Sequence, residues 1–370
     1  MEDFTDLPYT LITHTGVNST IEDEDEYPYT YYDDKNGISQ NHFDIEKIIH
    51  IVSAVIYAVA FFLGTIGNGL VIWMTGFRMK KTVNTVWFLN LAIADFIFTF
   101  FLPLSIVYTA LGFHWPFGTF MCKLNSTITI LNLFASIFLL TVISIDRCLA
   151  VVHPVWSQNH RTPRLASMIS IAVWFLALIA SLPYAFFKDT KMIGDKTMCF
   201  NNFILTDKHV SAYMSYLAIL RHRFLIITRF LIGFFIPFTV IVSCYTIIAF
   251  RLHVNHLATS TKPFKIIIAV IILFFVCWFP YHVFSFLELS SQRGHNSYMT
   301  NILNIGIPLT SSLAFLNSCV NPFLYVFIGR DFKEKLRVSF LSIFEKAFNE
   351  DYAGTEIKSK AKLTSNSQVV

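Results

Sequence analysis

Residues 48–77 read IIHIVSAVIYAVAFFLGTIGNGLVIWMTGF, thirty consecutive positions without an Asp, Glu, Lys or Arg. A helix needs about 20 apolar residues to cross the hydrocarbon core of a bilayer, so this stretch is long enough to span a membrane. Its side chains do not alternate between apolar and polar, as the strands of a membrane barrel do. Six further stretches share these properties, each with at most one charged residue: roughly 82–111, 124–145, 165–187, 224–250, 266–287 and 297–329. The sequence therefore predicts an all-α membrane protein with a seven-transmembrane helix bundle.

The composition agrees with this fold class and excludes a soluble protein. Hydrophobic residues make up 54% of the 370 positions and charged residues only 14%, whereas soluble domains average about 45–50% and about 25%. The net charge of +4 hides a separation, because residues 1–47 carry −10 and the rest of the chain carries +14. The total therefore does not describe a nucleic-acid-binding surface, and we expect no nucleic acid partner.

Lys and Arg residues gather at one end of the predicted helices. They lie in the links after the first, third and fifth stretches and in the segment after the seventh, whereas the link 111–118 on the opposite side has no charge. Such cations mark the cytoplasmic side of a membrane protein. We expect a multi-pass protein of the plasma membrane, with the N-terminus outside and the C-terminus in the cytoplasm. The cations are Arg78, Lys80, Lys81, Arg161, Arg164, Arg251, Lys262, Lys265, Arg330, Lys333, Lys335 and Arg337.

Four regions follow from this topology. Residues 1–47 form an extracellular acidic segment that we expect to be disordered, and residues 48–330 form the helix bundle. Residues 331–345 place Phe332, Leu336 and Phe340 four positions apart among cations, which predicts an amphipathic helix on an anionic lipid leaflet. Residues 346–370 form a cytoplasmic tail with candidate phosphorylation sites at Thr355, Ser359, Thr364, Ser365 and Ser367.

The outer side carries two predicted modifications. Asn18 begins an Asn-Ser-Thr sequence, which is a glycosylation acceptor outside the cell. Cys122 and Cys199 are the two of the six cysteines that lie at the outer side, an oxidising compartment, so a disulfide between them is expected.

Seven short motifs stand in order, one in each predicted helix: Gly67-Asn68, Leu91-Ala92-Ile93-Ala94-Asp95, Asp146-Arg147-Cys148, Trp174, Pro237 with Tyr245, Cys277-Trp278-Phe279-Pro280, and Asn321-Pro322-Phe323-Leu324-Tyr325. Each motif alone is weak, but the ordered set closely resembles the rhodopsin-like (class A) G-protein-coupled receptors. The resemblance implies a signalling receptor and not an enzyme.

A closer likeness covers about residues 45–350. HWPFG at 114–118, HPVWSQNHR at 153–161 and AFLNSC at 314–319 resemble the chemoattractant peptide receptors. KKTVNTVWFL at 80–89, KPFK at 262–265 and CFNNF at 199–203 look most like the chemerin receptors. Formyl peptide receptors are the near neighbours, but Leu225 and Ile130 stand where those receptors carry a second arginine and an acid.

Arg229 is the most informative residue for ligand binding. An arginine at membrane depth costs about 2.5–3.5 kcal/mol on insertion scales, so it should face a cavity with a partner. Snorkelling to the outer surface is the alternative. The likeness to chemerin receptors implies that Arg229 anchors the C-terminal carboxylate of an extracellular peptide or protein ligand. Glu288 is expected to pair with Arg229 or to receive a ligand cation, and its alternative is a solvated loop acid. The remaining predicted ligand-binding residues are Ser126, Thr129 and Ile130.

Asp95 is the second charge predicted to be buried. The family pattern places small oxygen-bearing side chains around it, and hard cations bind such oxygen ligands. The resemblance implies an allosteric sodium ion, with no other cofactor, that stabilises the inactive state; a structural polar network with water is the alternative. The predicted ligands are Asp95, Asn132, Ser136, Asn317, Ser318 and Asn321.

The family pattern also implies an activation switch. A neighbouring acid holds Arg147 at rest, and its release opens a groove for a heterotrimeric G protein, by resemblance of the inhibitory class. Arrestin and receptor kinases are the further expected partners, with membrane lipids around the bundle. The predicted switch residues are Asp146, Arg147, Tyr245, Phe274, Trp278, Pro280, Asn321, Pro322 and Tyr325.

Other classes fit the sequence less well. The His-Glu-x-x-His motif of an intramembrane metalloprotease is absent, and no lysine that could bind retinal occurs between Lys265 and Lys333. Two alternatives within the family stay open: a formyl-peptide-type chemoattractant receptor, and a chemerin-binding receptor that couples weakly to G proteins.

Overall fold

The computed structural model describes residues 35–205, 212–254, 262–291 and 297–328, together with positions 334, 337 and 338. In this part of the chain, seven helices are long and apolar enough to cross a membrane, which confirms the predicted bundle. The candidate spans are Lys47–Arg78, Val83–Ala110, Gly118–Val152, Pro163–Phe187, Tyr213–Val254, Ile268–Ser291 and Ile302–Phe323.

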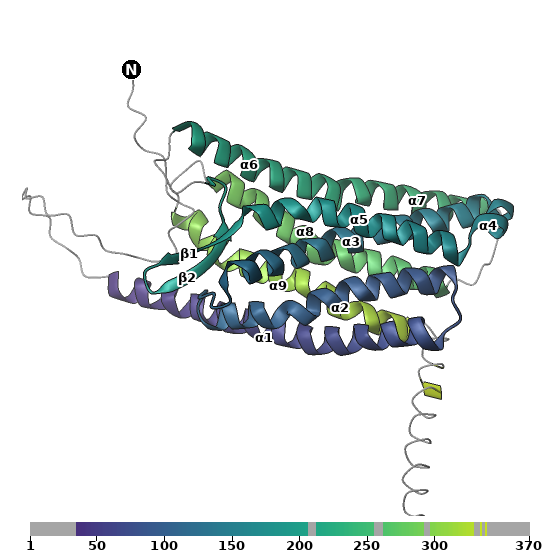
Figure 1. The fold of residues 1–370 in the computed structure, drawn as a ribbon, viewed down its shortest axis with the longest axis horizontal. Helices are drawn as coiled ribbons and strands as arrows, with labels where there is room; N and C mark the ends of the chain where they lie inside the picture. The colour runs from purple at the N-terminus through teal and green to yellow at the C-terminus, as the bar shows by residue number, and fades with distance from the viewer. Residues whose placement is uncertain are drawn as a thin grey trace, which may run out of the picture.

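The helices pack alongside one another in a single bundle, as Figure 1 shows. The first four spans contain α1 (Lys35–Trp73) with the π-helical turn η1 (Met74–Arg78), α2 (Val83–Ala110), α3 (Gly118–Val152) and α5 (Pro163–Phe187). The fifth is formed by α6 (Ala212–Phe230), the π-helical turn η2 (Leu231–Phe235) and α7 (Ile236–Val254). The sixth and seventh lie in α8 (Lys262–Ser291) and α9 (Ser297–Ile328). The short helix α4 (Pro154–His160) links α3 to α5 at one end of the bundle.

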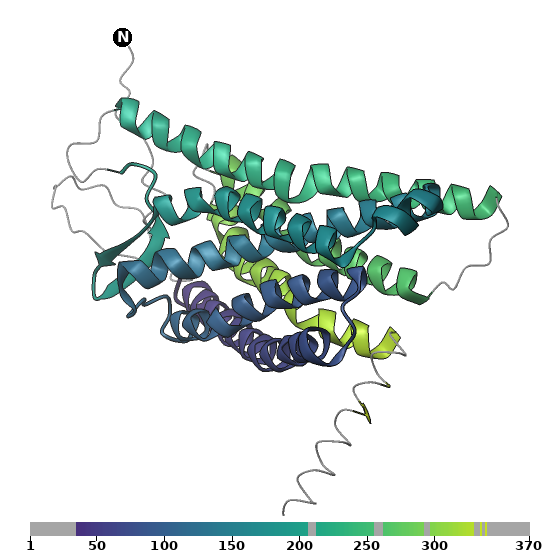
Figure 2. The same ribbon diagram turned by 45° about the vertical axis from the view of Figure 1, so that its right-hand side comes forward.

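Two helices are longer than the charge-free stretches suggested. The fifth span begins at Tyr213 and not near residue 224, and Figure 2 shows α6 and α7 as one long helix along the edge of the bundle. Arg221 lies inside this helix and donates to the carbonyl of Phe203 at 2.7 Å. Charged residues mark where a chain leaves the hydrocarbon, but they do not end a helix. For the same reason α1 already begins at Lys35, before its candidate span begins at Lys47.

Helix α3 forms the centre of the bundle. In its most apolar window 67% of the residues are buried, compared with 28% in the spans of α1 and α5. It packs against α2, α5 and α7, and its residues Leu133, Ile137 and Leu139 are fully enclosed in the main apolar cluster. Apolar side chains on the outer helices, such as Ile171 and Phe175 of α5, are exposed because they face lipid.

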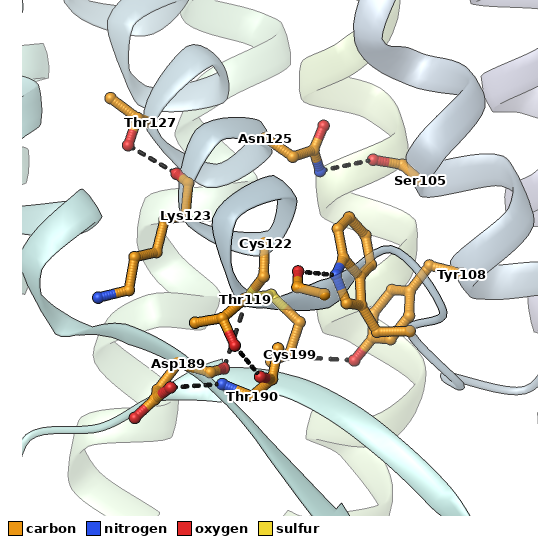
Figure 3. The surroundings of a disulfide bond; sticks show 12 residues. Ser105, Tyr108, Thr119, Cys122, Lys123, Asn125, Thr127, Asp189, Thr190 and Cys199 are labelled. Atoms are coloured by element: carbon orange, nitrogen blue, oxygen red, sulfur yellow. Dashed lines mark hydrogen bonds between the residues drawn. A yellow bond between two sulfur atoms is a disulfide. The ribbon is translucent and has the colours of Figure 1, made fainter.

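A hairpin covers the end of the bundle opposite α4 (Figure 1). Strands β1 (Lys188–Ile193) and β2 (Lys196–Asn201) pair antiparallel. The predicted disulfide is confirmed: Cys199 of β2 is bonded to Cys122 of α3, with the two Cα atoms 5.8 Å apart. Figure 3 shows a second link beside it, where the hydroxyls of Thr119 and Thr190 are hydrogen-bonded. The hairpin is therefore fixed over the N-terminal end of α3.

A π-helical turn begins at Leu231, two residues after Arg229. Pro237 has no N–H and cannot donate to the carbonyl of Gly233, four residues earlier. A local widening of the helix accommodates such a missing bond, and η2 spans Leu231–Phe235. The wide turn therefore lies between α6, which carries Arg229, and α7.

Candidate functional site

Arg229 lies between two helices with its side chain almost completely enclosed. It is 8% exposed, and its two terminal nitrogens donate to Tyr281 Oη at 2.9 Å and to Ser285 Oγ at 2.8 Å, both on α8. The guanidinium also lies over the Tyr281 ring, 4.8 Å from the centroid, a favourable cation–π position. The side chain therefore faces the bundle interior and does not snorkel.

Two further charged groups, Glu288 and Lys188, interact electrostatically with Arg229. Glu288 of α8 interacts electrostatically with Arg229 and with Lys188, the first residue of β1. Burial lowers the pKa of Lys188 to about 8, with the Arg229 charge also lowering it and Glu288 opposing this. No carboxylate of the described residues lies within the 4.0 Å of an ion pair with Arg229. The three groups together carry a net positive charge that favours an anion.

Lys188 was not among the residues predicted from the sequence. It follows the last residue of α5, so by sequence it could equally be a solvated loop lysine. The one available signal was that no other Lys or Arg occurs between Arg164 and Lys191. Its approach to Arg229 and Glu288 requires α5, α6 and α8 to meet, which only the tertiary structure establishes.

The predicted ligand residues on α3 have local contacts in the structure. Thr129 donates its hydroxyl to the carbonyl of Asn125 at 2.9 Å. Ser126, the residue after Asn125, is half-buried. Ile130 is 6% exposed and belongs to an apolar cluster with Phe134. Their contacts with a ligand stay a prediction.

Asp95 is completely buried in a polar cluster at the centre of the bundle. Its two carboxylate oxygens accept hydrogen bonds from Asn132 at 3.0 Å and Asn321 at 2.8 Å. Ser318 donates to the side-chain carbonyl of Asn132 at 3.2 Å. The tertiary structure thus joins four of the six residues predicted to bind sodium.

Spare acceptors remain on α3 and α9, two of the helices that form this cluster. In the described part of the chain, the buried oxygens Ser136 Oγ, Asn317 Oδ1 and Asn321 Oδ1 have no hydrogen-bond partner. Buried polar atoms are rarely left unsatisfied, and a carboxylate with several neutral oxygens is the ligand set that a hard cation takes. The donor set therefore fits a sodium ion.

The predicted switch residues of α8 connect to Arg229 through aromatic contacts. Trp278 is 3% exposed and lies 5.7 Å from the Tyr281 ring and 6.0 Å from the Phe274 ring, between centroids. Because Tyr281 is also the hydrogen-bond partner of Arg229, the contacts run without a gap from Arg229 to Phe274. Pro280 lies inside α8, where a proline frees a backbone carbonyl and permits a kink.

Arg147 lies near the end of α3 that leads into α4, beside the acid Asp146. One of its terminal nitrogens lies 3.3 Å from Asp146 Oδ2. Arg161, which the sequence predicted only as a cytoplasmic cation, forms a shorter ion pair with the same carboxylate. Tyr245 of α7 lies close enough for an electrostatic contact with Arg147.

Several predicted features lie outside the described residues. They are the glycosylation site at Asn18, the side chain of Tyr325, nearly all of the predicted amphipathic helix 331–345, and the tail 346–370. Asn321 and Pro322 are described and lie in α9. The features outside the description stay predictions.

Comparison with known proteins identifies the family. Residues 67–325 match the model of the 7 transmembrane receptor (rhodopsin family). Chemerin-like receptor 1 of Homo sapiens is 46% identical over 340 residues, which cover 90% of this chain and 89% of that protein. Chemerin-like receptor 1 of Sus scrofa is 44% identical over 360 residues, which cover 95% and 96%. Chemerin-like receptor 2 of Rattus norvegicus is 43% identical over 332 residues, which cover 89% and 90%.

These similarities extend over the whole bundle and agree with the geometry. The seven spans, the disulfide between α3 and β2 and the polar cluster around Asp95 all lie within or across the matched region. A protein of this family is a multi-pass membrane receptor and not an enzyme, and it works with an extracellular ligand and a G protein. This chain therefore belongs to the rhodopsin family of seven-transmembrane, G-protein-coupled receptors.

Proposed function

We propose that this chain is a plasma-membrane receptor for a chemoattractant or adipokine-type peptide or protein, of the chemerin kind, with its N-terminus outside the cell. The names of the relatives support this ligand class, since the relatives named above are called chemerin-like receptors. The C-terminal carboxylate of the ligand enters the bundle and binds Arg229.

The observation that carries this proposal is the enclosed and incompletely compensated charge of Arg229. Its terminal nitrogens contact neutral hydroxyls, and Nε has no partner in the described part of the chain. Removing a cation from water is costly unless an anion compensates it. A carboxylate can accept two parallel hydrogen bonds from a guanidinium and supplies the missing charge.

The path from this site to the cytoplasm uses the aromatic contacts of α8. A carboxylate on Arg229 competes with Tyr281 for the guanidinium, and Tyr281 packs on Trp278. A rearrangement of Trp278 and Phe274 next to Pro280 would change the bend of α8. This change releases Arg147 and opens the groove for a G protein of the inhibitory class, followed by receptor kinases and arrestin at the tail.

The polar cluster at Asp95 is the second part of the proposal. A sodium ion bound by Asp95 with Ser136, Asn132, Asn317, Ser318 and Asn321 would hold α2, α3 and α9 together in the resting arrangement. Agonist and sodium then oppose each other because each favours a different state.

Ligand class is tested by measuring cAMP and arrestin recruitment in cells that express the receptor. Chemerin-type peptides with a free C-terminal carboxylate should signal, whereas the same peptides with a C-terminal amide should be much weaker. Formylated peptides serve as the competing class. A response to formylated peptides alone, or equal potency of acid and amide forms, would refute the proposal.

The pH dependence of binding gives a separate prediction. Lys188, whose pKa is about 8, is protonated at pH 7 and attracts the ligand carboxylate, but it loses its charge as the pH rises. Affinity for the carboxylate peptide should therefore fall by up to about tenfold between pH 7 and pH 9. A radioligand measurement across this range checks it. Lys188→Arg keeps its charge throughout and should flatten the profile, so an equally steep profile in that variant would contradict the assignment.

A further inference from the structure

The carboxylate of Asp146 at the cytoplasmic end of α3 is bound in a fork by Arg161. Arg161 Nε donates to Asp146 Oδ1 at 2.8 Å, and one terminal nitrogen donates to Oδ2 at 3.0 Å. Two parallel bonds of this length are the preferred geometry of an arginine–carboxylate pair. Arg161 directly follows α4, so this pair joins the link between α3 and α5 to the end of α3.

Arg147 is the weaker partner of the same carboxylate. Its terminal nitrogen lies 3.3 Å from Asp146 Oδ2, longer than the roughly 2.7–2.9 Å of a charge-assisted hydrogen bond. Both arginines also donate to one oxygen of Asn84, Arg161 at 2.8 Å and Arg147 in a close contact. Two guanidinium groups therefore share one carboxylate and one amide oxygen as acceptors.

The two guanidinium groups repel each other. The side chains of Asp146, Arg147 and Arg161 are only 13%, 16% and 25% exposed, so solvent and salt screen their charges less than those of a surface pair. Arg147 experiences the charge of Arg161 directly. Arg161 thus weakens the hold on Arg147 in two ways, by occupying Asp146 and by repulsion.

A nearby replacement for Asp146 is missing from the following helices. The sequence contains no Asp or Glu between Asp207 and Glu288, so α7 and the cytoplasmic half of α8 offer Arg147 no second carboxylate. How strongly Arg147 is held at rest then depends on the competition for Asp146.

We propose that Arg161 is a positioning residue that sets the activation threshold, by competing with Arg147 for Asp146 and so easing the release of Arg147. The proposal rests on the proposed function, in which Arg147 is the switch toward the G protein. Removing Arg161 should leave Asp146 to Arg147 alone and stabilise the resting state.

The test is agonist-stimulated nucleotide exchange by an inhibitory G protein in membranes with equal receptor density. Arg161→Gln should lower basal exchange and raise the agonist concentration for half-maximal response by about fivefold. This factor corresponds to the largest coupling energies found for exposed ion pairs. Arg164→Gln is the matched control, because Arg164 is an exposed arginine three positions later and its loss changes the cytoplasmic charge equally. This control should behave as the wild type.

A double-variant cycle separates the competition from a purely structural role. When Asp146 is replaced by Asn, Arg161→Gln should have a much smaller effect on basal or stimulated exchange, since the contested charge is gone and only the repulsion between the two arginines remains. Unchanged or increased basal exchange in Arg161→Gln would overturn the proposal, as would an equal loss in both backgrounds. A wild-type receptor that drives no exchange with any peptide would instead refute the proposed function, and with it the premise.

Discussion

Replacing Arg229 with alanine should raise the concentration of a carboxylate-ended peptide needed for half-maximal signalling by at least about 100-fold, while the receptor still reaches the cell surface. Hydrogen bonds to charged groups contribute about 1.5–3 kcal/mol each, and every 1.4 kcal/mol is a factor of ten in affinity. Folding should tolerate the change, because the variant removes a buried cation whose protein partners are the neutral hydroxyls of Tyr281 and Ser285. cAMP inhibition and surface staining of the same cells measure both quantities.

Two comparisons make this test specific for a carboxylate. Arg229→Lys keeps the charge but cannot form the fork, so its potency should lie between those of wild type and Arg229→Ala. Amidation of the peptide should weaken signalling in the wild type but have little further effect in Arg229→Ala. An unchanged dose response in Arg229→Ala, with normal surface expression, would exclude this residue as the anchor.

Sodium should lower agonist affinity by about fivefold or more in the wild type, and Asp95→Asn should abolish this effect. The substitution has nearly the same shape but removes the one negative charge of the polar cluster, whose neighbours Asn132 and Asn321 are neutral. A hard cation binds poorly to neutral oxygens alone. Agonist binding in sodium chloride is compared with binding in choline chloride at equal ionic strength.

A milder substitution checks that the effect depends on the spare oxygens. Ser136→Ala removes a buried hydroxyl that has no partner in the described part of the chain, so it should weaken sodium regulation with little loss of stability. If sodium has no effect in the wild type, or the same effect in Asp95→Asn, the cluster is a structural network and not an ion site.

The sequence predicted the helices well because each span must by itself be apolar and long enough to cross the membrane. Every charge-free stretch has to be long enough to cross the hydrocarbon core, whatever its neighbours are. The same reasoning by location paired Cys122 with Cys199. It was less accurate at the ends, since the fifth span continues past Arg221 to Tyr213, and a helix outside the core is not limited by charge.

The sequence also identified Arg229 and Asp95 as charges that need partners, because their cost at membrane depth is independent of the details of packing. It did not reveal which atoms those partners are. Tyr281 and Ser285 are neutral residues more than fifty positions from Arg229, and nothing in their local pattern distinguishes them from other polar residues in α8.

By itself, then, the sequence determined the number of spans, their orientation as a prediction, the outer disulfide and the two charges buried in the bundle. Only the tertiary structure decided that Lys188 lies near Arg229, that the contacts of Arg229 continue to Trp278, and that Arg161 and Arg147 contact the same carboxylate of Asp146. The physical reason is that the membrane acts on each segment separately. A binding or switching contact depends instead on how side chains from distant segments point once the helices have packed.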